Sequence, residues 1–365
     1  MKPFLALFSA TLLCAIHLPI QAQAQAQTPA QTPAPGWRMT DSGTQVELRG
    51  LSVVSPTVAW ASGAKATVLR TVDGEHWQAM QVAGADGLDF RDIQAFDKDH
   101  ALIMSAGPGD KSRIYQTSDG GASWQLLKTN QEPAGFWDAF AFFDAKNGML
   151  FGDAVNGRFQ VLVTADGGAS WQEQSHAGLT ALPNEGGFAA SGTCIAVYGK
   201  QAAWIVTGGA DAARVFRSTD LGKSWAASNL PIPAAAASKG AFSVAFLDEK
   251  NGMVVGGDYK LPQLDTLNAA RTEDGGMSWV ASPVLPKGFM SVIATVPGAA
   301  HTYVAAGLAG SGISVDGGKS WRVLGTTPVN TVAFANASTG WAIGPKGLLM
   351  TYQAGELPLP KPVAK

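Results

Sequence analysis

The feature that most constrains the fold is a motif, Ser/Thr-x-Asp-x-Gly-x-Ser-Trp, which occurs six times along the 365-residue chain. The first copy (71–77) is one residue shorter, and Leu221 replaces a glycine in the fourth. Successive motif aspartates are 46, 47, 54, 54 and 42 residues apart, and such a period indicates the blades of a propeller. The motif residues that we expect to be structural are Asp73, Trp77, Asp119, Trp124, Asp166, Trp171, Asp220, Trp225, Asp274, Trp279, Asp316 and Trp321.

The motif has the chemistry of a hairpin turn. Its aspartate can accept hydrogen bonds from nearby backbone amides, and its glycines adopt positive φ without steric cost. Its tryptophan is large enough to pack between adjacent sheets. Each copy therefore predicts one turn between two outer strands of a blade.

A second repeated element precedes each motif and predicts the number of blades. It consists of an apolar strand, a polar turn and a strand that ends in glycine, as in 139–152 and 243–256. A seventh copy, 331–352, has no motif after it, whereas Trp37 lies ahead of the first full repeat. We predict an all-β fold, a seven-bladed β-propeller of four-stranded antiparallel blades, over residues 36–355. The N-terminal segment is expected to supply the outer strand of the last blade and so to close the ring.

Both ends of the chain lie outside this predicted domain. Residues 1–26 have a positive start, an apolar run and Ala-x-Ala sites, as expected of a cleaved signal peptide. Residues 27–35 read as a low-complexity Gln/Ala/Thr/Pro tether, and 356–365 as a proline-rich tail. We therefore expect a periplasmic or secreted protein. Because Cys194 alone remains after cleavage, in an apolar run, we expect a small buried side chain and no disulfide-linked partner.

The repeats resemble known families. The turn motif resembles the Asp-box, or BNR, repeat of sialidase-like propellers, in which the box residues lie at the blade periphery. The alternation of this motif with segments such as 147–152 and 339–344 resembles the photosystem II stability/assembly factor propellers. Stretches such as 136–140, 151–159, 185–193 and 256–260 are closest to the uncharacterised non-photosynthetic bacterial members of that family. The resemblance implies the fold; nothing in the sequence indicates a photosynthetic host.

Composition and motifs argue against several functions. A net charge of −2 argues against a nucleic-acid binder. The arginines Arg70, Arg217 and Arg271 precede motifs in three blades, too far from the axis to form a sialidase site. The glycine cluster 307–312 lacks dinucleotide-binding spacing, and the histidines lack metal-ligand spacing, so we expect no cofactor, metal or catalytic residue.

One group of polar residues remains as a candidate ligand-binding or partner-binding site. Asp153 and Asp258 follow the glycine that ends the second strand in blades 3 and 5, Glu185 begins blade 4 and Asp138 begins blade 3. Loops of this kind gather around the axis of a propeller, where ligands commonly bind. The candidate site residues are Asp138, Asp153, Arg158, Glu185, Arg214, Asp258, Tyr259 and Lys260. The alternative is that these acids cap turns.

Three function classes follow from this pattern. The first is an exported binding or assembly factor that docks a protein or peptide partner, such as a membrane complex, on one propeller face. The second is a glycosidase or sialidase-like hydrolase that uses the acidic loops of blades 3 to 5. The third is a carbohydrate-binding propeller, in which aromatic side chains such as Trp137 stack on sugars.

Overall fold

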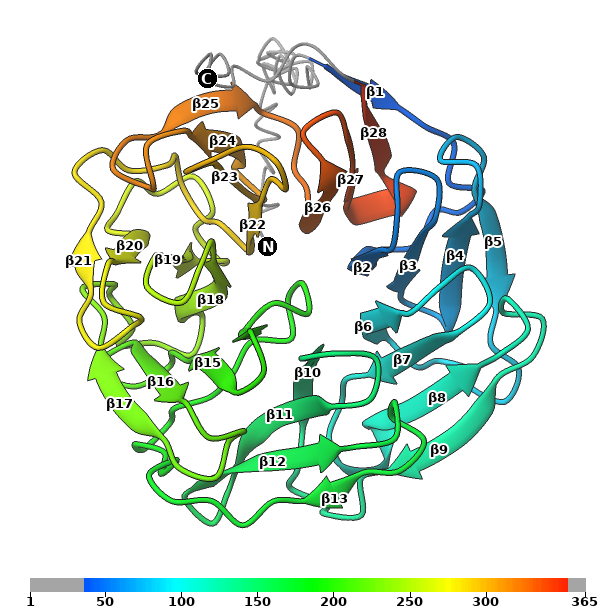
Figure 1. Cartoon of the computed structure of the whole chain (residues 1–365), viewed down its shortest axis with the longest axis horizontal. Helices are drawn as coiled ribbons and strands as arrows, with labels where there is room; N and C mark the ends of the chain where they lie inside the picture. Colours follow the sequence, from blue (N-terminus) through cyan, green and yellow to red (C-terminus); the bar gives the residue numbers. More distant parts are fainter. Residues whose placement is uncertain (1–35, 354–365) are drawn as a thin grey trace, which may run out of the picture. The chain divides into compact units, whose positions relative to one another are not determined.

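The computed structural model describes residues 36–353, in which seven four-stranded antiparallel sheets are arranged in a ring around a common axis (Figure 1). This arrangement confirms the predicted seven-bladed propeller. The predicted signal peptide, tether and C-terminal tail lie outside the described residues. Within residues 36–353, the helical segments are two short 3₁₀ turns, η1 (Gly109–Lys111) and η2 (Pro345–Gly347). No helix in this range has the length and apolar character needed to cross a membrane.

Each blade is a consecutive meander of strands, except the last. Blade 1 contains β2 (Leu48–Val53), β3 (Ala59–Gly63), β4 (Thr67–Thr71) and β5 (Gln78–Gln81). Blade 2 contains β6 (Phe90–Ala95), β7 (Ala101–Ser105), β8 (Arg113–Thr117) and β9 (Gln125–Thr129). Blade 3 contains β10 (Trp137–Phe142), β11 (Gly148–Val155), β12 (Arg158–Thr164) and β13 (Gln172–Glu173). Blade 4 contains β14 (Ile195–Tyr198), β15 (Ala202–Val206), β16 (Arg214–Ser218) and β17 (Ala226–Asn229). Blade 5 contains β18 (Lys239–Phe246), β19 (Gly252–Asp258), β20 (Ala269–Thr272) and β21 (Val280–Ala281). Blade 6 contains β22 (Val292–Thr295), β23 (Tyr303–Gly307), β24 (Gly310–Ser314) and β25 (Arg322–Gly325).

The seventh blade joins the two ends of the described chain. It contains β26 (Thr331–Asn336), β27 (Thr339–Ile343), β28 (Leu349–Gln353) and, as its outer strand, β1 (Trp37–Met39). Trp37 pairs with Tyr352 in the antiparallel register of β1 and β28, and its ring packs on both Tyr352 and Phe334. Trp37 therefore anchors the N-terminal strand, and the predicted closure of the ring is confirmed.

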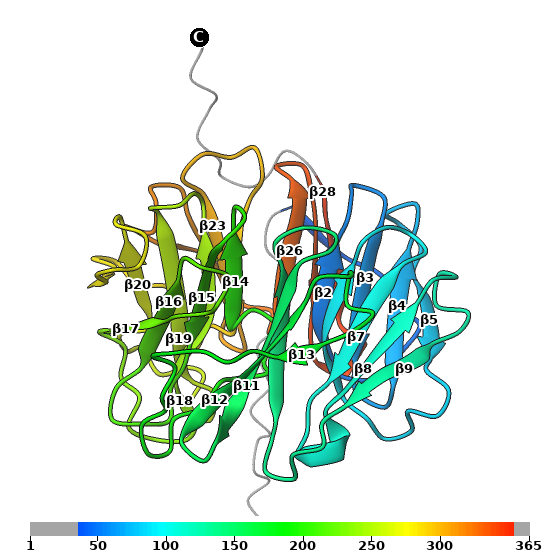
Figure 2. The ribbon, with the colours of Figure 1, turned by 60° about the horizontal axis from the view of Figure 1, so that its bottom comes forward.

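The blades pack on one another through apolar side chains. The second strands β3 and β7 are buried along their whole length because neighbouring sheets cover both of their faces, whereas the outer strand β5 is largely exposed. Trp204 of blade 4 stacks on Phe246 of blade 5 with ring centroids 3.6 Å apart. Figure 2 shows the blades standing side by side around the axis.

The strand order separates two faces of the ring. One side of the ring carries the loops that enter each first strand and the loops that join second to third strands. We call this side the pocket face. The opposite side, the turn face, carries the loops joining first to second and third to fourth strands. Because the strands of a blade are antiparallel, these two sets of loops lie at opposite ends of the sheets. All six repeated motifs join third to fourth strands and so lie on the turn face.

Candidate functional site

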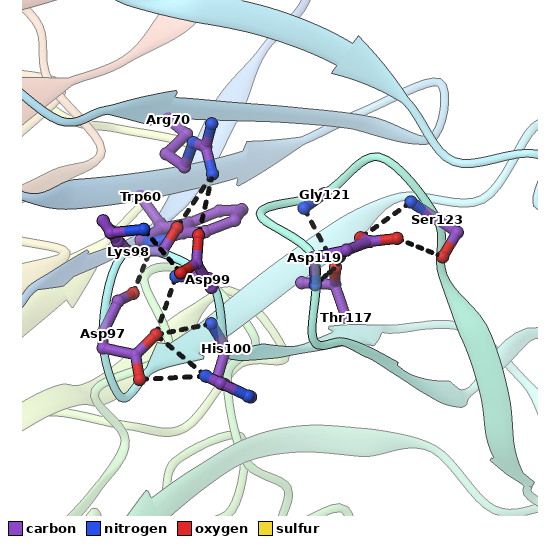
Figure 3. Close-up of polar contacts among 10 residues, drawn as sticks. All are labelled: Trp60, Arg70, Asp97, Lys98, Asp99, His100, Thr117, Asp119, Gly121 and Ser123. Carbon is purple, nitrogen blue, oxygen red and sulfur yellow. Dashed lines mark hydrogen bonds and ion pairs between the residues drawn. The ribbon is translucent and has the colours of Figure 1, made fainter.

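The repeated motifs form hydrogen-bonded turns, as Figure 3 shows for blade 2. Asp119 accepts hydrogen bonds from the Thr117 hydroxyl (2.8 Å) and from the Ser123 amide (2.9 Å) and hydroxyl (2.6 Å), and the Gly121 amide donates to Thr117 Oγ1 (2.9 Å). These bonds, those from Ser123 foremost, lower the pKa of Asp119 to about 2. Asp166, Asp220, Asp274 and Asp316 make the same contacts.

Two copies of the motif depart from this pattern. In the shortened first copy, His76 occupies the place of the serine, and its Nδ1 lies 2.8 Å from Asp73 Oδ2. In the fourth copy, Leu221 takes the position of a glycine with a φ of 62°, the left-handed region that glycine tolerates best. The motif therefore keeps its geometry even where its residues change.

The tryptophans of the motifs lie where neighbouring blades meet. Trp171, Trp225, Trp279 and Trp321 are buried, exposing 6–8% of their surface. Trp171 belongs to an apolar cluster that includes Leu102 and Met104 of the preceding blade. The half-buried Trp77 and Trp124 contact Trp341 and Trp60 of the preceding blade edge to face. The motif residues are thus part of the scaffold on the turn face.

On the pocket face, four of the seven first strands carry bulges at equivalent positions. In β2, β6, β10 and β18, one extra residue interrupts the pairing with the second strand, and these residues are Arg49, Arg91, Asp138 and Phe242. A bulge leaves its extra residue outside the ladder and redirects its side chain. All four of these residues line one cavity, which indicates that the bulges shape it.

This cavity, the axial pocket, lies on the ring axis because all seven blades contribute to its wall. It has a volume of about 440 Å³. Its lining consists of Glu47, Arg49, Arg91, Phe136, Asp138, Asp153, Gly187, Phe188, Ala189, Ala190, Ala237, Phe242, Tyr259, Phe289, Ser291, Leu308 and Asn330. Three of the predicted site residues, Asp138, Asp153 and Tyr259, are therefore brought together here.

Asp138 and Asp153 form an acid pair in the axial pocket. Asp153 is itself the extra residue of a bulge, on β11 against β12, and its Oδ1 accepts a hydrogen bond from the Gly187 amide (2.8 Å). Burial raises the pKa of Asp153 to about 6. Burial, followed by the charge of Asp153, raises the pKa of Asp138 well above its usual range. Neither carboxyl therefore ionises at the pH typical of an exposed aspartate.

A glycine pair allows the loop of blade 4 to close over these acids. A Cβ on Gly187 would lie 2.7 Å from Asp138 Oδ2, and one on Gly186 would lie 2.8 Å from Asp153 Oδ1. Both distances are shorter than normal contacts, so a side chain at either position would push the loop away from the acids. The close approach of this loop to the acids therefore requires glycine at positions 186 and 187.

Two arginines that the sequence analysis did not single out complete the polar wall. Arg49 Nη2 donates to Glu47 (2.8 Å) and Arg91 Nε donates to Asp89 (2.8 Å). Both guanidinium groups also reach the loop of blade 4, at the carbonyl oxygens of Ala190 (3.4 Å) and Ala189 (3.3 Å). When the first strands of the repeats are aligned, both arginines fall in the column of Asp138, and this is the sequence signal for them.

Aromatic rings form the apolar part of the wall. Phe188 stacks on Phe242 with centroids 3.7 Å apart, and Phe289 meets Phe242 edge to face at 4.8 Å. Tyr259 lies at the rim, 6.2 Å from Phe242, with 42% of its surface exposed. The pocket wall therefore combines carboxyl groups with aromatic rings.

Glu185 and Arg214 form a buried ion pair. The Arg214 Nε donates to Glu185 Oε1 (2.8 Å) and its Nη2 bonds to Oε2. Glu185 also accepts hydrogen bonds from the Thr207 hydroxyl (2.6 Å) and the Leu182 amide (2.8 Å). These contacts occupy the carboxylate and hold the loop of blade 4 in place. Neither side chain lines the axial pocket.

The other predicted site residues also lie outside the pocket wall. Asp258 faces Lys239, with Nζ and Oδ2 3.9 Å apart, and caps the Lys260 amide (3.0 Å). Arg158 donates to the carbonyl oxygen of His176 (2.6 Å). The matched sequence positions of Asp153 and Asp258 thus have different surroundings, because Asp153 lies in a bulge under the loop of blade 4.

Trp137, Cys194 and Asp92 are buried. Trp137 exposes only 1% of its surface, so its predicted use as an exposed stacking ring is wrong; it is buried between blades. Cys194 is fully buried in the apolar core, as predicted. Asp92, which the sequence did not predict as a buried group, accepts hydrogen bonds from the backbone amides of Phe140 and Ile93, each at 2.8 Å. It therefore connects blade 2 to blade 3. Among the described residues, no three His, Cys, Asp or Glu side chains are grouped as a metal site.

Comparisons with known proteins find propellers. No protein-family model matches the chain, and no curated protein matches it in sequence. A structure of YCF48 bound to a D1 peptide matches with a TM-score of 0.62 and 17% identity, over 88% of this chain and 99% of that chain. YCF48 from Cyanidioschyzon merolae matches with a TM-score of 0.57 and 15% identity, over 87% and 99%. An ancestral GH74 enzyme matches with a TM-score of 0.60 and 13% identity, over 86% of this chain but 45% of that chain. Such similarities concern the fold.

Proposed function

We propose that this chain is an exported propeller that binds a protein or peptide partner on its pocket face. The observation that carries the proposal is the axial pocket, whose wall is built by all seven blades and combines paired acids, arginines and aromatic rings. Polar anchors within an apolar wall are the usual composition of a binding site.

The rim of the pocket favours a macromolecular partner. The loop between β19 and β20 exposes Leu261, Leu264 and Leu267 by 55%, 49% and 39%, next to the exposed Tyr259. Large exposed apolar side chains that lie together commonly mark protein interaction sites. The loop is anchored, because the carbonyl oxygen of Pro262 accepts the Phe289 amide (2.8 Å). A fixed apolar rim beside a pocket suits a chain segment that inserts one side chain and rests on the rim.

A structural neighbour agrees with this class of partner. The YCF48 propeller was solved with a D1 peptide bound. At 17% identity this neighbour supports the general idea of a peptide-binding propeller, and the proposal for this chain depends on its own pocket.

The proposed location follows from residues 1–26. Their signal-peptide pattern supports export and cleavage, and the tether 27–35 would then separate the propeller from its new N-terminus. The partner would be a periplasmic or extracellular protein, or an exposed segment of a membrane complex.

A glycoside hydrolase or carbohydrate-binding propeller is the second candidate, favoured by the acid pair. Hydrolases of this kind use two carboxyl groups, and an ancestral GH74 enzyme shares the fold. However, the GH74 similarity, at 13% identity, concerns the fold alone, so this candidate depends on the acid pair by itself. Hydrolysis of aryl glycosides that is lost in Asp153→Asn would favour this candidate over the first.

Site-directed photo-crosslinking in the native host tests the binding proposal. A photoreactive phenylalanine replaces Tyr259 at the pocket rim, or Met277 on the turn face, which is 63% exposed and serves as the matched control. We expect one discrete adduct from position 259 and none from position 277. Equal adducts from both positions, or none from position 259, would contradict the proposal.

A further inference from the structure

One oxygen atom in the axial pocket lacks a partner. Asp138 lines the pocket and exposes 1% of its surface, and its Oδ2 makes no hydrogen bond to any described residue. A buried carboxyl oxygen without a donor costs free energy that a ligand's N–H group can recover. The Ala189 amide lowers the pKa of the Asp138 carboxyl but makes no hydrogen bond to Oδ2, so the pocket wall supplies no donor to this atom.

The charges around the pocket do not supply that donor. The charged side chains of its wall are Glu47, Asp138, Asp153, Arg49 and Arg91, so carboxyl groups outnumber guanidinium groups. Each arginine is already paired with a carboxylate: Arg49 lies 2.8 Å from Glu47, and Arg91 lies 2.8 Å from Asp89. Arg91 offsets part of the charge on Asp138 without bonding to Oδ2. The acid pair is thus the incompletely neutralised part of the pocket.

The apolar wall suits the same kind of occupant. Phe188 and Phe289 pack on Phe242 in the wall, and the partly exposed Tyr259 lies at the entrance. Cations are attracted to the faces of aromatic rings, and an alkyl chain gains free energy by leaving water beside them. A volume of about 440 Å³ admits one long side chain.

We propose that the axial pocket is a subsite for a lysine side chain of the partner, with the ammonium group against Asp138 and Asp153 and the alkyl chain along the phenylalanine rings. An ammonium group has three donors and no acceptor, which matches two carboxyl groups with a free oxygen. This inference rests on the proposed function, since it names the chemistry of the residue that the partner inserts.

The test uses the full mature chain and two small probes. The first probe is N-α-acetyl-lysine methylamide; the second is its Nε-acetyl derivative, which has nearly the same shape and no charge. Binding is followed by NMR titration at matched ionic strength and about pH 7.5, above the pKa of Asp153. We expect saturable binding of the lysine probe and at least about tenfold weaker binding of the acetylated one.

Two variants assign the binding to the acid pair. In the double variant Asp138→Asn/Asp153→Asn, we expect affinity for the lysine probe to fall by at least about tenfold. Asp153→Asn alone, with its fold checked by its NMR spectrum, should show a loss in the same direction. Asp86→Asn, an exposed aspartate on the same face, should bind like the unaltered chain.

Three results would overturn the inference: no saturable binding of the lysine probe, equal binding of both probes, or unchanged binding in a folded Asp153→Asn variant. The crosslinking at Tyr259 is independent of these measurements. An adduct at Tyr259 without lysine discrimination removes this inference alone. Lysine discrimination without an adduct contradicts the proposed partner binding, and the axial pocket is then a lysine-binding pocket without the proposed partner.

Discussion

Replacing Asp153 by asparagine should stabilise the protein at neutral pH. In the folded protein burial raises the pKa of Asp153 from 3.8 to about 6. Between these two values the folded state holds a proton that the unfolded chain has released. The free energy of unfolding therefore falls as the pH rises through this window and stays at the lower level above it.

The magnitude follows from the size of the shift. A pKa difference of about two units corresponds to about 3 kcal/mol of stability lost between pH 4 and pH 6. Asparagine does not titrate, and its side-chain oxygen can still accept the Gly187 amide that Asp153 accepts at 2.8 Å. At about pH 7.5 we expect Asp153→Asn to be more stable than the unaltered chain by about 1–3 kcal/mol. Near pH 4 the two should be similar.

Guanidinium unfolding followed by tryptophan fluorescence at both pH values measures this difference. Comparing variant with unaltered chain at each pH cancels the contribution of the turn-face aspartates, whose lowered pKa values give the opposite pH trend. The control is Asp86→Asn, which should change little at either pH. The reasoning is refuted if Asp153→Asn is no more stable at about pH 7.5, or if its effect is the same at both pH values.

Three further predictions concern the scaffold and the N-terminus. Trp171→Ala should destabilise the fold by about 3–5 kcal/mol in guanidinium unfolding, because the ring is buried between blades. The folded fraction should bind the partner as before. Lost binding in a stable variant would mean that Trp171 belongs to a binding site. Arg214→Ala should cost about 3–5 kcal/mol in the same assay, since Glu185 would keep a buried charge without its partner; a cost below about 1 kcal/mol would contradict a closed ion pair. N-terminal sequencing of exported protein should start near Gln25 or Gln27, and an acylated start at Cys14 would refute signal-peptide cleavage at the Ala-x-Ala sites.

The fold could be predicted because each repeat encodes its own turn. Asp119 and its counterparts bond only to residues within a few positions, so their motif is visible in a short window of sequence. The unmatched Trp37 and the unfinished seventh repeat together indicated the closing strand. Repetition supplied the number of blades, which a single local motif cannot do.

The site could be predicted only in part, because its geometry depends on contacts between distant segments. Asp138 and Asp153 stand beside strand ends, which sequence position reveals. Glu185 stands in a similar place, yet Arg214, 29 positions later, occupies its carboxylate. The bulges that carry Arg49 and Arg91 into the pocket depend on strand register, which the residue types do not specify.

The pairing of β1 with β28 has a consequence for the timing of folding. The hydroxyls of Thr40 and Thr351 lie 2.8 Å apart although 311 positions separate them. A ribosome makes β1 first and β28 last, so β1 has no partner until nearly the whole chain has emerged. Blades 1 to 6 can form their own hairpins as they appear, while the earliest strand waits. A chain stalled or cut before residue 349 would therefore leave β1 unpaired and the ring open.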